Sequence, residues 1–273
     1  MKSFAIPAMF VAAFLCLVPS ALADDVAYAG SSIGAFGTMD LSTGVFTLEG
    51  NTTQTLAGMA VANGELFASS YHTTNGTLYT VDPATGALTT VGTATGFDYD
   101  DFGSTTTGLY ALSAGSPSLY SIDPTTGAAT LIGPTGLVGY GSWRGLSTNS
   151  STLYFADGGD LYTLSTTTGA ATLVGAFGSS AEMGVLLTED GVLYGGDDTN
   201  NTLDTIDPTT GTATVGPTPS GGFGGSFYAL APYPVPTGVT SVTPEPSSFL
   251  LLGTGLAGLL WMARRKIGTH VNL

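Results

Sequence analysis

A short segment ending in glycine recurs five times along the chain at an almost constant interval. Its glycines, Gly44, Gly86, Gly127, Gly169 and Gly211, are 42, 41, 42 and 42 residues apart. Upstream of each lies an aromatic residue in a short apolar stretch, at positions 28, 67, 110, 154 and 194. Self-similarity at a fixed period requires a fold made of equal units packed side by side, and no other feature of the chain restricts its architecture as strongly.

Each copy has the pattern of a β-hairpin. Apolar and polar residues alternate over 119–122 and again over 129–133, on either side of Asp-Pro-Thr-Thr-Gly at 123–127. In such a segment Asp accepts hydrogen bonds from backbone N–H groups, Pro presets φ, and Gly supplies a left-handed conformation. Ser165 replaces Asp in the fourth copy. The signature therefore indicates turn chemistry rather than a ring of metal-binding carboxylates.

Two further strands precede each hairpin, which gives four strands in about 42 residues. This pattern predicts an all-β fold, a five-bladed β-propeller over residues 24–234. The first unit lacks its leading strand, and an extra strand at 226–230 follows the last unit. We expect the extra strand to complete the first blade and close the ring, which would protect the sheet edges. An open β-solenoid is the alternative.

The N-terminus has the pattern of a secretory signal peptide over residues 1–23. Lys2 is followed by an apolar stretch at 4–18 and by the small-residue triplet that ends at Ala23. Cleavage there would remove Cys16, the single cysteine of the chain. The mature protein would then have no disulfide, no catalytic thiol and no thiolate metal site. An exported protein is predicted.

A second apolar stretch lies near the C-terminus. Pro244-Glu245-Pro246 is followed by an apolar run at 249–263 and then by three cations, Arg264, Arg265 and Lys266. Counted from residue 247, the 17-residue segment is just long enough for a helix to cross a hydrocarbon core of roughly 30 Å. The cations would stay in the cytoplasm by the positive-inside rule. We expect a single transmembrane helix within 244–267, preceded by a spacer at 235–243 and followed by a tail at 268–273.

The order of motif, apolar segment and basic cluster resembles the PEP-CTERM sorting signal. The likeness rests on residues 242–247, on the glycines within the apolar run and on the Arg-Arg-Lys cluster; Thr243 and the seven residues after Lys266 depart from the usual pattern. The resemblance implies an exosortase, a membrane protease, as processing partner. It also implies transient anchoring in the inner membrane before release to the cell surface or the extracellular space. An ordinary single-pass anchor is the alternative. The repeats themselves resemble, more loosely, propeller repeats of exported bacterial proteins.

The predicted extracellular part, residues 24–243, is strongly acidic. It contains 19 Asp and Glu residues and a single cation, Arg144, for a formal net charge of −18. Such a surface repels nucleic acid and anionic lipid, which excludes both as partners. Cations and neutral polymers are the partners that this charge suits.

No catalytic constellation is apparent, and we expect a protein that is not an enzyme. His72 is the one histidine of the extracellular part, and no nucleophile motif accompanies it. The alternative is a propeller-type hydrolase that acts on polysaccharide through paired carboxylates. The favoured interpretation is a surface or extracellular-matrix protein that works as a binding or structural module.

Two groups of residues are candidate contact sites. Acidic side chains gather in the predicted loops, and as hard oxygen ligands they could bind Ca²⁺, the sole cofactor considered: Asp98, Asp100, Asp101, Asp157 and Asp160. Solvated loop acids are the alternative. Trp143 and Arg144 form the one aromatic and cationic pair, suited to an acidic exopolysaccharide, although Trp143 could instead pack between blades.

Overall fold

The computed structural model describes residues 25–233 except 72–75, 94–96, 114–115, 139–143, 179–180 and 190. Within this part the fold is all-β, with no helix that has the length and apolar character needed to cross a bilayer. The predicted signal peptide, spacer, sorting signal, transmembrane helix and tail lie outside the described residues.

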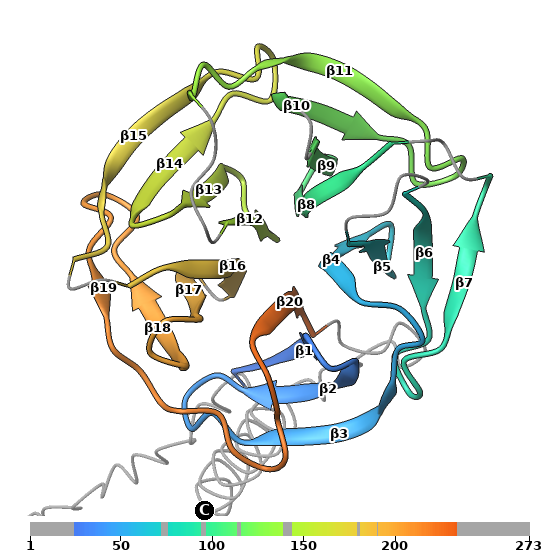
Figure 1. The fold of residues 1–273 in the computed structure, drawn as a ribbon, viewed down its shortest axis with the longest axis vertical. Helices are drawn as coiled ribbons and strands as arrows, with labels where there is room; N and C mark the ends of the chain where they lie inside the picture. The colour runs from blue at the N-terminus through green and yellow to red at the C-terminus, as the bar shows by residue number, and fades with distance from the viewer. Residues whose placement is uncertain are drawn as a thin grey trace, which may run out of the picture. The chain divides into compact units, whose positions relative to one another are not determined.

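The strands form antiparallel four-strand units, each ordered from the inside outward (Figure 1). Unit 1 consists of β20 (Phe227–Pro232), β1 (Val26–Ser31), β2 (Ala35–Asp40) and β3 (Phe46–Asn51). Unit 2 consists of β4 (Leu56–Ala62), β5 (Glu65–Ser70), β6 (Leu78–Val81) and β7 (Leu88–Val91). Unit 3 consists of β8 (Tyr99–Thr105), β9 (Gly108–Ser113), β10 (Ser116–Ile122) and β11 (Ala129–Pro134).

Units 4 and 5 belong to one curled sheet of eight strands. Unit 4 consists of β12 (Arg144–Thr148), β13 (Leu153–Asp157), β14 (Asp160–Leu164) and β15 (Ala171–Ala176). Unit 5 consists of β16 (Met183–Glu189), β17 (Val192–Asp197), β18 (Thr202–Ile206) and β19 (Ala213–Thr214). A short parallel pairing joins them, in which Ser147 and Thr148 of β12 face Leu186 and Leu187 of β16.

The inner strands surround a common axis (Figure 1). Around this axis β20 contacts β4, β4 contacts β8, β8 contacts β12, β12 pairs with β16, and β16 contacts β20 again. The last strand of the described chain pairs antiparallel with the first, with Tyr28 opposite Ala231. The prediction that a C-terminal strand completes the first unit is confirmed, and its pairing removes the edge that β1 would otherwise expose.

The recurring glycines act in the turns as the sequence predicts. Gly44, Gly86, Gly127, Gly169 and Gly211 all have positive φ, between 70° and 80°. In each turn the glycine N–H donates to the carbonyl of the residue four positions earlier, at 2.7–2.8 Å. The Asp123 carboxylate accepts from the N–H groups of Thr125 and Thr126 at 2.7 and 3.1 Å. Local chemistry therefore fixes the outer hairpin of each unit.

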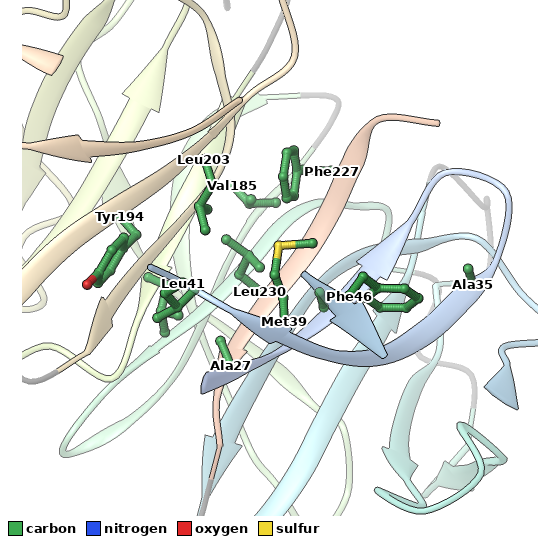
Figure 2. Packing of buried hydrophobic residues seen from close by; sticks show 12 residues of the cluster. Ala27, Ala35, Met39, Leu41, Phe46, Val185, Tyr194, Leu203, Phe227 and Leu230 are labelled. Carbon is green, nitrogen blue, oxygen red and sulfur yellow. The ribbon is translucent and has the colours of Figure 1, made fainter. Parts of the chain in front are cut away.

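The aromatic landmark of each repeat packs against a neighbouring unit. Tyr28 shares a buried cluster with Met59 of β4, and Tyr194 shares one with Leu230 of β20. Figure 2 shows the second of these clusters, where Phe227 and Leu230 of β20 lie beside Val185 of β16. Burying such apolar surface between units holds adjacent sheets together. Each sequence repeat thus contributes one equivalent aromatic residue to the buried contact between neighbouring units.

Candidate functional site

A hollow of about 170 Å³ opens where the five inner strands begin. It is lined from β4, β8, β12, β16 and β20 together with the residues that follow β5 and β17: Leu56, Ala57, Tyr71, Asp100, Asp101, Arg144, Gly184, Asp198, Phe227 and Tyr228. We call it the axial pocket. A second hollow, of about 570 Å³, lies near Asn63 and Asn149, where inner strands end, and none of its lining residues is charged. The axial pocket, which charged side chains line, is therefore the candidate functional site.

One position of the repeat supplies a pocket residue from every unit. It lies three residues before the inner-strand residue that faces the aromatic landmark, and its five occupants are Ala57, Asp100, Arg144, Gly184 and Tyr228. In units 1, 2, 3 and 5 the strand register shifts at this position. A β-bulge re-aims a side chain and is common beside functional sites.

Arg144 is tied to two aspartates of the neighbouring unit. Its guanidinium donates to Asp100 Oδ1 at 2.6 Å, and its Nε lies 4.0 Å from Asp101 Oδ2. The side chains are 17%, 1% and 4% exposed, respectively. At this burial a carboxylate needs a compensating charge. The positive charge of Arg144 is therefore engaged within the protein.

Asp101 lies in a crowded acidic environment. Burial raises the pKa of its carboxyl well above the ordinary value, and the charge of Asp100 raises it further. Arg144 lowers this pKa, whereas Asp157, which faces Arg144 across the β12–β13 pair, raises it. The positive charge of one guanidinium is thus shared among several nearby carboxyl groups.

Asp198 faces the pocket without a cation. Its Oδ1 accepts from the backbone N–H of Phe227 at 2.9 Å, whereas its buried Oδ2 has no hydrogen-bond partner. Burial raises the pKa of Asp198 to about 7, against the lowering effect of hydrogen bonds from Phe227 and Ser226. The carboxylate of its neighbour Asp197 accepts from the N–H groups of Thr199 and Asn200 and caps a turn.

Aromatic side chains complete the wall. The rings of Tyr71 and Tyr228 lie with their centroids 5.2 Å apart at 54°. Burial raises the pKa of Tyr71, and the nearby Tyr228 and Asp100 raise it further. Phe227 is fully buried beside them. Such faces can stack on a sugar ring or attract a cation.

The structure brings together some of the candidate residues and not others. Arg144, Asp100 and Asp101 line the axial pocket, and Asp157 lies next to them. Asp98 and Asp160 do not line it; Asp160 pairs with Asp157 across the β13–β14 hairpin. Trp143, His72, the motif at 244–246 and the cations at 264–266 lie outside the described residues.

No group of three or more His, Cys, Asp or Glu side chains that could hold a metal ion occurs in the described part of the chain. The acids predicted to bind Ca²⁺, Asp98, Asp100, Asp101, Asp157 and Asp160, are thus not gathered around a common point there. The reason is visible at Asp100 and Asp101, where the Arg144 guanidinium occupies the place of a cation.

Tyr71, Asp198, Phe227 and Tyr228 line the pocket and are not among the predicted site residues. Tyr71 and Asp198 share a position, four residues after the aromatic landmark of their units. Aligning the repeats on that landmark would have placed both beside the pocket. Phe227 and Tyr228 belong to the closing strand, and their place becomes evident once that strand is assigned to unit 1.

Comparison with known proteins identifies the C-terminal segment. Residues 242–266 match the PEP-CTERM protein-sorting motif. This match supports an exported surface protein that is sorted by an exosortase and anchored transiently in the membrane. A comparison with curated protein sequences gives no match.

Solved structures resemble the described fold at low sequence identity. One, from a crystal structure of a nidogen/laminin complex, superposes with a TM-score of 0.53 at 9% identity, over 76% of this chain and 97% of that chain. A Bacteroides thetaiotaomicron VPI-5482 protein gives 0.44 at 18% identity, over 70% and 49%. The Myxococcus xanthus glutaminyl cyclase gives 0.46 at 18% identity, over 76% and 74%. The nidogen/laminin likeness supports a propeller-like fold and nothing about activity.

Proposed function

We propose that this chain is an exosortase-sorted surface protein whose five-bladed propeller binds an extracellular ligand in the axial pocket without catalysing a reaction. The observation that carries the binding role is the convergence of five different residue types from one repeat position on a single hollow. A purely structural repeat would need no such variety at that position. Ligand pockets with a few converging polar groups on an apolar frame are the usual form of binding sites.

Five blades are the natural interpretation of the five four-strand units. Each unit matches one 42-residue repeat, and the contacts of the inner strands return to their starting point. The eight-stranded sheet would then be two blades joined by the short pairing of β12 with β16. A closed ring would place all five copies of this repeat position around one axis.

We propose that the exosortase cleaves the chain at the Pro-Glu-Pro motif. Proline disfavours the helical conformation of the residue before it, and a 17-residue apolar segment is at the short end of what spans a bilayer, so we expect an extended motif and a weak anchor. Mass spectrometry of the exported protein should find a C-terminus near residues 244–246. Replacing the motif by alanines should trap the full-length chain in the inner membrane. Residues 249–266 still attached to the extracellular protein would refute this processing.

The binding role is tested with the exported protein on a glycan array that includes the polysaccharides of the producing cell. Retention of one glycan class, lost when pocket residues are changed, is the expected result. If no glycan is retained and deletion of the gene still weakens matrix cohesion, the protein is a structural matrix component instead. The array separates these two roles directly.

A hydrolase is the second candidate, because the pKa of Asp198 stands at about 7, in the range that suits a general acid at neutral pH. Release of reducing ends from a polysaccharide, abolished in Asp198→Asn with the fold retained, would establish it. Binding is favoured over this alternative because the other two pocket carboxyls, of Asp100 and Asp101, are paired with Arg144.

A further inference from the structure

Resting on the proposed binding function, we propose that the axial pocket binds a protonated amine, as carried by a de-N-acetylated amino sugar in a polysaccharide. The inference follows from the charges that line the pocket, from the acceptor atoms left without donors, and from the aromatic wall.

Negative groups outnumber positive ones in the axial pocket. Asp100, Asp101 and Asp198 line it together with a single cation, Arg144. Arg144 contacts Asp100 and approaches Asp101, so Asp198 has no ion-pair partner in the described part of the chain. A ligand with a positive charge would complete the balance, whereas an anionic ligand would add to the repulsion.

Among the buried carboxylate oxygens of the pocket, Asp101 Oδ2 and Asp198 Oδ2 accept no hydrogen bond; the Asp101 side chain is 4% exposed. Buried acceptors without donors are rare in native proteins, and each requires an explanation. An ammonium group carries three donors and a compensating charge. It therefore supplies the donors that both atoms lack and, at Asp198, the compensating charge as well.

The backbone beneath Asp198 is shaped to leave this carboxyl in place. A Cβ at Gly184 would collide with Asp198 Oδ2 and would come within 3.1 Å of the Phe227 carbonyl oxygen. Glycine at this copy of the bulged position thus makes room for the carboxyl group. The pocket has space next to it, since about 170 Å³ corresponds to several waters at roughly 30 Å³ each. One sugar ring or a small amine is of suitable size.

The aromatic wall favours an organic cation over a metal ion. Tyr71 and Tyr228, whose rings lie 5.2 Å apart, line the pocket and are only partly buried, and tyrosine rings attract ammonium groups as well as the C–H face of a sugar. Metal ions need several ligands around one point, and the described residues contain no group of three or more His, Cys, Asp or Glu side chains that could hold one.

This ligand class replaces the acidic polysaccharide expected from Trp143 and Arg144. The guanidinium that was to bind a carboxylate already binds Asp100. The net charge of −18 over residues 24–243 also attracts a polycation and repels a polyanion at long range. The Arg144–Asp100 ion pair and the net negative charge thus both favour a cationic ligand.

The test compares ligands that differ only in the amine. The exported protein is titrated calorimetrically at pH 6.5 with a tetramer of 2-amino-2-deoxyglucose, with its fully N-acetylated form, and with a tetramer of galacturonic acid. We expect one-to-one binding of the amine at least ten-fold tighter than of the acetylated form, and no binding of the acid.

Matched variants separate the pocket from the general charge of the surface. Asp198→Asn and Asp101→Asn should each weaken amine binding ten-fold or more, since each removes a charge-assisted hydrogen bond. Glu65→Gln removes the same charge from an exposed hairpin and should leave binding unchanged. Thermal melting confirms that each variant is folded.

The outcomes distinguish this inference from the function on which it rests. Tighter binding of the acetylated or the acidic tetramer, abolished in the pocket variants, would overturn the amine and leave the binding function standing. Amine binding that Glu65→Gln weakens as much as Asp198→Asn does would show surface attraction only and would overturn it as well. If none of the three tetramers binds and the glycan array is also negative, both proposals are wrong.

Discussion

Asp198→Asn should make the protein more stable at neutral and alkaline pH, although it removes a charged residue from a folded domain. The carboxyl is largely buried, its Oδ2 has no hydrogen-bond donor, and no cation faces it in the described residues. Asparagine keeps the shape and the acceptor for the Phe227 N–H, and it carries no charge. The native state then no longer has to hold a buried negative charge.

The size and the pH range of the effect follow from the pKa of Asp198, about 7 in the folded protein against an ordinary 3.8. Each pKa unit is worth about 1.36 kcal/mol, so the ceiling of the effect is roughly 4 kcal/mol. Because the folded pKa is raised, Asp198 costs the protein no stability below pH 3.8, where its carboxyl is protonated in both the folded and the unfolded state. As the pH rises from 3.8 to 7, the carboxyl ionises in the unfolded state first, and the free energy of unfolding falls. The gain from Asp198→Asn is therefore absent in acid and complete above pH 7.

Urea unfolding of the wild-type and variant proteins at several pH values between 4 and 8 measures the difference directly. Glu65→Gln is the control, because it removes an equal charge from an exposed site and reports the general repulsion of the acidic surface. A gain that is the same at pH 4 and pH 8, or a loss of stability at pH 8, would refute the argument from burial. A protonated amine bound beside Asp198 should reduce the gain, because it stabilises the wild-type carboxylate.

Three other substitutions test the packing, the ion pair and the turns, each by urea unfolding. Phe227→Ala empties a fully buried position on the closing strand and should cost about 3–5 kcal/mol, whereas Leu131→Ala on an outer strand, 59% exposed, should change stability by less than about 0.5 kcal/mol. Arg144→Met leaves Asp100 and Asp101 without their cation and should cost about 3–5 kcal/mol, a loss reduced by adding Asp100→Asn. Gly127→Ala forces alanine to φ near +71° and should cost about 1–2 kcal/mol.

The fold could be predicted from sequence because local chemistry repeats at each turn. Asp123 and Gly127 make the same turn bonds as their counterparts in the other copies, and the tyrosines at 28, 110 and 194 occupy one buried position. Five samples of a single pattern give a far stronger signal than one. The closing strand was predictable for a related reason, since an unpaired first strand and an unpaired last strand can satisfy each other.

The site was less predictable because its residues depart from the repeat. Arg144, Asp100 and Asp101 are visible in the sequence as charged residues, but no local pattern joins Arg144 to Asp100, 44 residues away. The sequence paired Arg144 with an external carboxylate, whereas in the structure its guanidinium donates to Asp100. Tyr228 carries no charge and resembles any core aromatic in sequence.

The repeated scaffold is nearly symmetric, whereas the pocket residues that it supplies differ from unit to unit. A bulged residue at the start of an inner strand contributes little to strand pairing, so its side chain is not fixed by the hairpin chemistry that makes the turns uniform. The four bulged copies therefore differ, as does Arg144, the copy whose strand pairing is regular, whereas the turns vary little from repeat to repeat. Arg144 pairs within the protein, Gly184 makes room, and Asp198 remains the one pocket carboxylate without a cation among the described residues. A ligand that compensates a charge in this pocket would have to do so at Asp198.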